Sequence, residues 1–277
     1  MTLREQEGDM ARPELNSKKC SVREEHLACE KFSYHAGGKY LAACLAFFLS
    51  GCGDSKLPIE GKNAEIVYSE AENLMRDNDF EDAAKRFKDI ETYFPYSEKA
   101  GTAQIMSAYC NFKNKSYIDA IRELDVFLRY HPSSELVPYA MYLRAVSKYM
   151  TVSTVGRDSA QAKDARKAFV ELINRFPTCK YVEDSQHKII ILDDIIAAHE
   201  MMIGRFYQQN KSSLAALGRY NYVVNKFPNT KSAEEAFYRI VECCANEGLQ
   251  EEANNAAAVL KARFPNGIWT KKLDKSK

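Results

Sequence analysis

The stretch "RFKDIETYFP", residues 86–95, ends in a ring-bearing residue followed by proline, and the chain repeats this ending four more times. The later copies are "ELDVFLRYHP" at 123–132, "FVELINRFP" at 169–177, "RYNYVVNKFP" at 219–228 and "AAVLKARFP" at 257–265. Proline pushes the residue before it out of the helical region, so helices usually end there. Five segments are therefore predicted to be helices that end at the same signal.

The five segments also share one register. Counting back from each proline, small or apolar residues recur at twelve, eight and five positions, and these steps trace one face of an α-helix. Alanine occupies the position twelve residues earlier in every copy, at Ala83, Ala120, Ala165, Ala216 and Ala253. The positions eight and five residues earlier hold Phe87, Leu124, Phe169, Tyr220 and Ala257, and Ile90, Phe127, Leu172, Val223 and Leu260.

This pattern resembles the tetratricopeptide repeat, a helix–turn–helix unit of about 34 residues. A preceding helix in three of the units supports the resemblance, because small residues stand where that helix needs close approach, at Ala71, Ala108 and Gly204. We predict an all-α helical solenoid of about five such repeats, whose curvature makes a concave binding face. Successive prolines lie 37, 45, 51 and 37 residues apart, which indicates insertions. We expect a loop at 151–161 and one long helix over most of 180–210.

Composition excludes several classes of function. The formal net charge is +1, and nucleic-acid binding requires a strong basic surplus, so we expect no nucleic-acid partner. The five histidines are scattered, and neither a phosphate-binding glycine loop nor a nucleophile elbow is present. We therefore expect no catalytic residue, no metal, no cofactor and no enzymatic activity.

The N-terminal region carries a different signal. The apolar run Tyr40–Leu49 is too short for a transmembrane helix, which needs about 20 residues. It leads into "LSGC", residues 49–52, which reads as a bacterial lipobox: cleavage between Gly51 and Cys52 would leave Cys52 as a lipidated N-terminus. A buried apolar helix with a chance cysteine is the alternative. Because this signal has an unusually long leading segment, we also hypothesise that translation starts near Val22 or Leu27.

We expect the chain to divide as follows. Residues 1–51 are a signal peptide, 52–62 a lipidated N-terminus and linker, 63–133 the N-terminal repeats 1 and 2, 134–270 the C-terminal repeats 3 to 5, and 271–277 a solvated basic tail. Export implies an oxidising compartment. Small apolar packing residues are nevertheless the default interpretation of Cys110, Cys179, Cys243 and Cys244.

A lipobox followed directly by degenerate tetratricopeptide repeats resembles the BamD family of outer-membrane assembly lipoproteins. The resemblance covers 58–270 and includes "YFPYSEKA", "VPYAMYLRAVSKY", "RDSAQAKDARKAFVELINRFPTCKYVEDS" and "HEMMIGRFY". It implies a lipid-anchored protein on the periplasmic face of the outer membrane. Its partners would be a BamA-type barrel protein at the C-terminal repeats, accessory assembly lipoproteins, and unfolded outer-membrane proteins at the N-terminal repeats. Gly53, rather than an aspartate, at position two after the anchor favours outer-membrane delivery.

The alternative function is that of a periplasmic tetratricopeptide scaffold for cell-division or envelope-maintenance complexes. Such scaffolds usually carry a coiled-coil segment ahead of the repeats and have no lipobox. In this chain the first repeat begins about a dozen residues after Cys52, and no heptads lie between them.

Two groups of residues are candidates for binding. In the tetratricopeptide register, an apolar strip with two cations lies on the concave face of repeats 1 and 2, and it could bind an aromatic, carboxylate-terminated peptide. Its members are Tyr68, Met75, Arg76, Ile105, Tyr109, Phe112 and Lys113. The competing interpretation is that several of them pack against the next repeat.

The second group faces the assembly partner. Arg219 flanks the core positions of its helix, so we expect it to face outward, and the resemblance implies that it meets an acidic residue of the BamA-type protein. Arginine suits this role because its planar fork can make two parallel bonds to one carboxylate. The loop around Arg157 and Asp158 is the second candidate for this contact. The competing interpretation of Arg219 is an arginine that pairs along its own helix.

Overall fold

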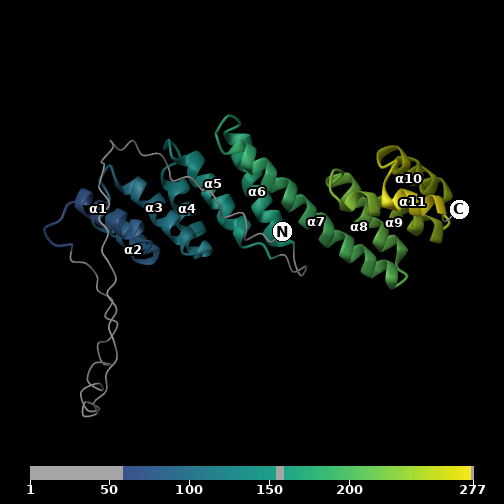
Figure 1. Cartoon of the computed structure of the whole chain (residues 1–277), viewed down its shortest axis with the longest axis horizontal. Helices are drawn as coiled ribbons and strands as arrows, with labels where there is room; N and C mark the ends of the chain where they lie inside the picture. Colours follow the sequence, from purple (N-terminus) through teal and green to yellow (C-terminus); the bar gives the residue numbers. More distant parts are fainter. Residues whose placement is uncertain (1–58, 154–158, 276–277) are drawn as a thin grey trace, which may run out of the picture. The chain divides into compact units, whose positions relative to one another are not determined.

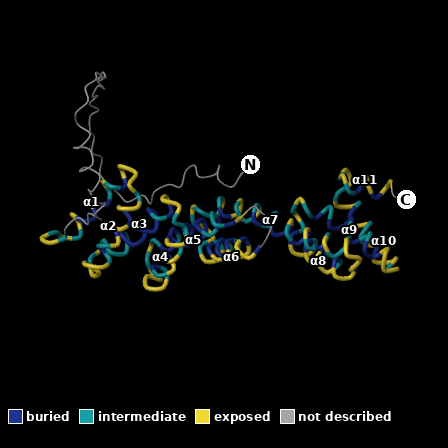
Figure 2. The backbone as a smooth tube through the Cα atoms, turned by 90° about the horizontal axis from the view of Figure 1, so that it is seen from below, coloured by how far each residue is buried: buried dark blue, intermediate teal, exposed yellow. Residues whose placement is uncertain are grey.

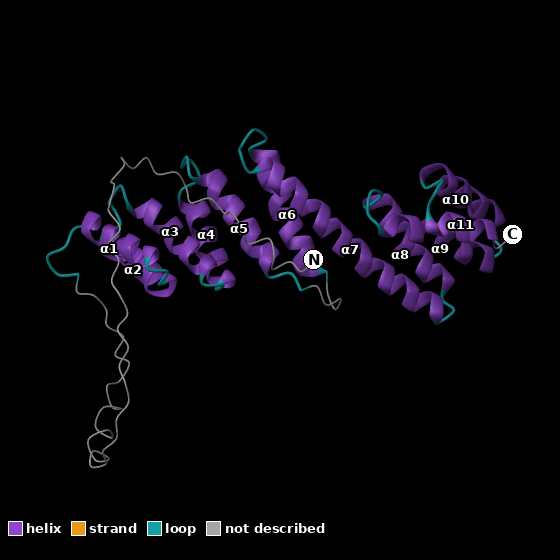
Figure 3. Ribbon diagram, viewed as in Figure 1, coloured by secondary structure: helices purple, strands orange, loops and turns teal. Residues whose placement is uncertain are grey.

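The computed structural model describes residues 59–153 and 159–275, and all of its secondary structure in this part of the chain is helical (Figure 3). All the described helices belong to one compact unit, which contains residues 63–277. The helices are α1 (Ala64–Arg76), α2 (Phe80–Tyr93), α3 (Ala100–Lys113), α4 (Tyr117–Tyr130), α5 (Val137–Met150), α6 (Ala160–Arg175), α7 (Val182–Gln209), α8 (Ser213–Lys226), α9 (Ser232–Asn246), α10 (Gln250–Arg263) and α11 (Ile268–Lys275).

The helices form antiparallel pairs, from α1 with α2 to α9 with α10, and each helix packs mainly against its neighbours in sequence (Figure 1). This arrangement confirms the predicted solenoid of five tetratricopeptide-like repeats. Buried residues lie along the helix faces that turn toward neighbouring helices (Figure 2). The fold is therefore a stack of small cores and not one central core, as expected for repeats that contact mainly their neighbours.

The predicted register is confirmed at the end of every second helix. The five alanines are at most 3% exposed, and the residues five positions before each proline are at most 1% exposed. In each unit the residue before proline caps the helix, and its N–H donates to the carbonyl oxygen four residues earlier, as from Phe94 to Ile90 and from Phe227 to Val223. Proline then ends the helix at the same place in every repeat.

The turns between paired helices share a feature that the sequence did not reveal. Asn78, Lys115, Lys211 and Gly248 each adopt a positive φ, between 60° and 74°, in four of the repeats. The residue that follows each of them donates its N–H to a carbonyl five residues back, as from Ser116 to Asn111 at 2.9 Å. This is the Schellman ending of a helix, which normally favours glycine at the left-handed position.

The two predicted insertions lie where the spacing placed them. α5 ends at Met150 and α6 begins at Ala160, and α7 runs for 28 residues from Val182 to Gln209. The first half of α7 packs on α6, and its second half packs on α8 and α9 (Figure 1).

The end of the chain differs from the prediction of a solvated tail. Residues 268–275 form α11, in which Leu273 is only 6% exposed and packs with Phe237, Tyr238 and Leu260. The helix begins where the Glu234 carboxylate accepts the N–H of Trp269 at 2.7 Å. The sequence did not indicate this helix, because the segment is short and basic and the residues that Leu273 packs against lie on α9 and α10.

Candidate binding surfaces

The strip predicted on repeats 1 and 2 is largely buried, and as an exposed apolar surface that prediction is wrong. Ile105 is 1% exposed, Tyr109 and Phe112 are each 7% exposed, and Tyr68 and Met75 are 5% and 3% exposed. The physical reason is that α3 lies between α2 and α4 and also contacts α1 and α5, so Ala103 to Cys110 are all buried.

Neighbouring side chains close over the strip. The ring of Tyr68 packs edge-on against Phe87 at 5.2 Å between centroids, and the ammonium group of Lys99 lies 4.9 Å from its centroid. Of the seven predicted residues, the two cations Arg76 and Lys113 are the exposed members. The two charges, and not the aromatic rings, are therefore the parts of the strip that are accessible to a ligand.

Arg219 is exposed, as the sequence predicted, but it also forms an ion pair with another helix. Its Nη1 donates to Oε2 of Glu200 on α7 at 3.1 Å, and 44% of its side chain is exposed. Lys163 of α6 donates to the other carboxylate oxygen at 3.0 Å. Arg219 thus pairs across helices, and one buried glutamate joins α6, α7 and α8.

The surroundings of Glu200 explain its ionisation. Burial leaves only 4% of its side chain exposed and tends to raise the pKa of its carboxyl. The hydrogen bonds and charges of Lys163 and Arg219 outweigh burial and hold the pKa of Glu200 below its ordinary value. The carboxylate is therefore charged in the folded protein and holds both cations in place.

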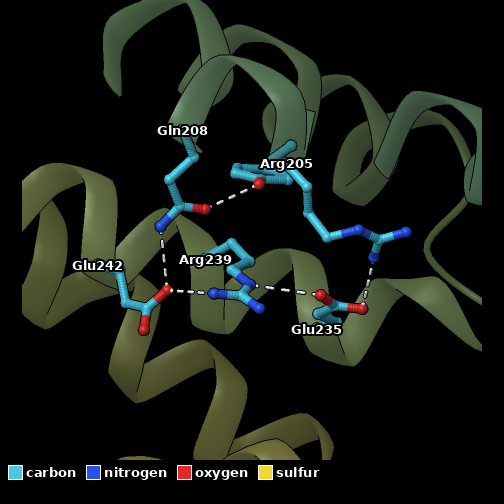
Figure 4. Close-up of polar contacts among 6 residues, drawn as sticks. Arg205, Gln208, Glu235, Arg239 and Glu242 are labelled. Carbon is cyan, nitrogen blue, oxygen red and sulfur yellow. Dashed lines mark hydrogen bonds and ion pairs between the residues drawn. The ribbon is translucent and has the colours of Figure 1, made fainter. Parts of the chain in front are cut away.

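A second polar network joins α7, α8 and α9 (Figure 4). Glu235 accepts bonds from Arg205 at 3.0 Å and from Arg239 at 3.3 Å, and Arg239 also donates to Glu242 at 2.8 Å. Gln208 of α7 connects this network to α8. Its amide group donates to Glu242 at 3.1 Å and accepts a hydrogen bond from the buried hydroxyl of Tyr220 at 2.9 Å. Two arginines and two glutamates neutralise one another, so the network stabilises the packing of the C-terminal repeats.

Burial alone would raise the pKa of the Glu242 carboxyl in this network. Hydrogen bonds from Tyr238, Gln208 and Arg239 outweigh that effect and lower the pKa. The network therefore stays charged and paired at neutral pH.

α7 carries an exposed apolar face that sequence reasoning did not single out. Steps of four, three, four and four residues connect Ile191, Ile195, Ala198, Met202 and Phe206, which we call the α7 apolar stripe. Met202 is 43% exposed and Phe206 is 61% exposed, whereas the opposite side of the helix is buried. The available signal was that apolar residues occur in adjacent runs, at 189–192, 195–198 and 201–203, so they cannot all lie on one face of the helix.

Two of the hollows on the described surface lie between helices. A polar one of about 440 Å³ lies between α2, α3 and α4 and includes Lys85, Lys88, Asn111 and Glu123. A second one of about 320 Å³ lies between α6, α7 and α8, and cations line its edges above an apolar floor. We call the second hollow the α6–α8 groove.

Several predicted site residues fall outside the part of the chain that the structure describes. They are Gly51 and Cys52 of the lipobox and Arg157 and Asp158 of the third repeat. Among residues 59–153 and 159–275, no group of histidine, cysteine or acidic side chains could hold a metal ion. None of the helices there has the length and apolar character needed to cross a membrane.

Comparison with known proteins places the chain in context. Residues 60–272 match the YfiO family, described as outer membrane lipoprotein. "Outer membrane protein assembly factor BamD" of Rickettsia prowazekii is 36% identical over 203 residues, which cover 73% of this chain and 81% of that protein. The protein of the same name in Caulobacter vibrioides is 32% identical over 232 residues, covering 82% of this chain and 76% of that protein. A BamD of Neisseria meningitidis serogroup A is 27% identical over 213 residues, which cover 73% of this chain and 80% of that protein.

Proposed function

Because the chain belongs to the outer membrane lipoprotein family that includes the BamD assembly factors, we propose that it acts in the assembly of outer-membrane proteins. The family match over residues 60–272, which includes all five repeats, is the observation that carries this conclusion. The chain works by binding and not by catalysis, because its relatives are named as assembly factors and helical solenoids present binding faces.

The first part of the proposal is a lipid anchor on Cys52 that holds the repeats at the periplasmic face of the outer membrane. Several acyl chains together give a stable anchor, whereas one chain gives only marginal binding. In the variant Cys52→Ala, we expect a longer, uncleaved precursor that leaves the outer-membrane fraction. Recovery of a processed, membrane-bound variant would contradict the anchor.

The second part places the BamA-type barrel protein at the C-terminal repeats, with Arg219 as a contact. Arg219 bonds Glu200 through one nitrogen and remains nearly half exposed, so the rest of its guanidinium group can bind a carboxylate of the partner. The loop around Arg157 and Asp158 is a second proposed contact. A compensating acid-to-base change on the partner should restore a complex that an Arg219 substitution weakens.

The choice of substitution matters because of Glu200. Arg219→Glu would place two carboxylates together and lower stability, so it cannot report on the partner alone. Arg219→Lys keeps a cation beside Glu200 and removes the planar fork. We expect Arg219→Lys to reduce co-purification of the barrel protein at moderate salt by about tenfold, while its melting temperature stays close to that of the parent. Arg122→Lys on α4 is the control. If both variants co-purified the same amount of the barrel protein, Arg219 would not be the contact.

The third part concerns incoming barrel proteins, which we propose to bind at repeats 1 and 2 through the exposed cations Arg76 and Lys113. Both side chains lie on the surface at the C-terminal ends of α1 and α3, so a terminal carboxylate can reach them. The double variant Arg76→Glu and Lys113→Glu should bind a C-terminal barrel peptide at least tenfold more weakly with unchanged helicity. Arg129→Glu, on the exposed side of α4, should bind it as the parent does. Parent-like binding by the double variant would exclude these cations.

A further inference from the structure

The α6–α8 groove exists because α7 is long. In this part of the repeat array α7 packs on α6 with its first half and on α8 with its second half. α6 and α8 therefore lie on either side of α7 and leave part of it as a floor between them (Figure 1). The result is a hollow of about 320 Å³, at the small end of the range for ligand sites, with room for a few side chains and not for a folded domain.

The floor of the groove is apolar. Ile196 of α7 is fully buried, and Phe227 at the end of α8 is 7% exposed. The ring of Tyr222 stands over them, 39% exposed, with its centroid 5.8 Å from that of Phe227 in an edge-on arrangement. A bulky apolar side chain placed here would lose contact with water and pack against two rings.

The edges of the groove are positive. Lys163 of α6 pairs with Glu200, which it shares with Arg219, and Arg166 pairs with Asp193. Lys167 and Lys226 stand exposed on opposite edges, and neither forms an ion pair with a residue that the structure describes. Since the whole chain has a net charge of only +1, this positive charge is a local feature of the groove.

We propose that the α6–α8 groove binds an acidic, extended segment of a partner protein, with carboxylates on Lys167 and Lys226 and one aromatic or aliphatic side chain against the exposed ring of Tyr222. Charge complementarity selects the acidic partner, and the recessed apolar floor favours a side chain of a peptide over a flat lipid surface or a phosphate ion. This site goes beyond the proposed function, because it requires neither the barrel protein nor the contact at Arg219.

The test uses the full chain and a labelled octapeptide that alternates aspartate with phenylalanine, with an asparagine counterpart. We expect the aspartate peptide to bind at least tenfold more tightly than the asparagine peptide, and the preference to weaken as salt is added. The double variant Lys167→Glu and Lys226→Glu should lose at least tenfold in affinity for the aspartate peptide. Tyr222→Ala should bind the aspartate peptide severalfold more weakly, because the substitution removes an aromatic ring that lines the groove.

A matched control separates the groove from net charge. Arg129→Glu with Lys271→Glu changes the charge of the chain by the same amount on exposed positions of α4 and α11, and it should bind the aspartate peptide as the parent does. Equal loss in the control, or parent-like binding by the groove variant, would overturn the proposal. The proposal would also be overturned if anionic phosphatidylglycerol vesicles bound the chain through Lys167 and Lys226 while binding of the aspartate peptide did not depend on these lysines. Because no barrel protein is present, these outcomes are independent of the co-purification test.

Discussion

The N-terminal repeats and the region around α7 use the same kinds of side chain for different purposes. In repeats 1 and 2 the prolines lie 37 residues apart, and α3 is enclosed by the helices on both sides. In the fourth repeat the spacing is 51 residues, and α7 packs against α6, α8 and α9 on one side while Met202 and Phe206 stay exposed on the other. Apolar residues at helical spacing are therefore core in the first region and surface in the second, and the closeness of the neighbouring repeat decides which.

The strongest test of this difference makes one substitution in both regions. Phe112 of α3 is 7% exposed and packs against Tyr117, whereas Phe206 on the α7 apolar stripe is 61% exposed. Phe112→Ala should lower the free energy of unfolding by about 3–5 kcal/mol, because it leaves a cavity. Phe206→Ala should change it by no more than about 0.5 kcal/mol.

Urea unfolding followed by circular dichroism measures both variants. Comparable losses would mean that the α7 stripe is packed as the N-terminal strip is. A small loss for Phe112→Ala would instead restore the strip as a surface available to a ligand.

A second test uses two glycines of the fourth repeat. A side chain at Gly204 of α7 would overlap the ring of Tyr220, which is fully buried and held by its bond to Gln208, so the ring cannot move aside easily. Gly204→Ala should therefore cost roughly 1–3 kcal/mol. Gly218 of α8 has open space around it, and Gly218→Ala should stabilise the chain by about 0.5–1 kcal/mol through helix propensity.

Thermal melts of the two variants should thus shift in opposite directions. If Gly204→Ala melted at or above the parent temperature, the close approach of α7 and α8 would be looser than the structure has it. The same experiment on Gly101 of α3, where an added carbon would make ordinary contact with Phe127, should give no loss.

The alanine–proline register could be read from the sequence because it depends on local rules: helical spacing, and proline ending a helix. The long α7 followed in the same way from the proline spacing and the absence of breakers. Burial of Tyr109 and Phe112 could not be read, because a helical period shows which residues share a face and not how many neighbours cover that face.

The same limit applies to polar side chains. Arg219 was correctly placed off the core face of its helix, yet its partner Glu200 lies nineteen residues away on another helix. The α6–α8 groove needs three helices in place before Lys167 and Lys226 line the same hollow. The Schellman turns at Lys115 and Lys211 carried no glycine to mark them.

Two glutamates extend the comparison to pH. Burial raises the pKa of Glu123 on α4, where Lys88 lies 3.9 Å away and one carboxylate oxygen has no hydrogen-bond partner among the described residues. The pKa of Glu200 is instead lowered, because Lys163 and Arg219 outweigh its burial. The ordinary pKa of a glutamate side chain is about 4.3. A pKa that is lowered in the folded state stabilises the protein above that pH, and this stability is lost as the pH falls through the folded-state pKa. A raised pKa adds stability only below about pH 4.3, and this stability is lost as the pH rises through the folded value.

The variants should therefore change stability in opposite directions. At pH 7, Glu200→Gln should melt several degrees below the parent, and the gap should close as the pH falls below 4. Glu123→Gln should melt at or above the parent at pH 7, with no difference in acid. Melting curves between pH 3 and 7 measure both, and a Glu200→Gln gap that is constant across this range would show that the pair with Lys163 and Arg219 does not set its ionisation.

The smallest predicted effect tests what the two regions share. Lys115 in repeat 2 and Lys211 in repeat 4 both adopt a left-handed conformation, with φ of 64° and 60°, and both precede a residue that closes the same Schellman bond. A side chain in this conformation costs about 1 kcal/mol relative to glycine. Lys115→Gly and Lys211→Gly should each raise the free energy of unfolding by up to about 1 kcal/mol, and by similar amounts, since the turn is local and does not depend on the length of the preceding helix. Gly248→Ala, at the same position of repeat 5, should lower it by about as much. A gain at Lys115 with a loss at Lys211 would mean that the long α7 strains its own turn, and the two regions would then differ in the geometry of the repeat itself and not only in what covers it.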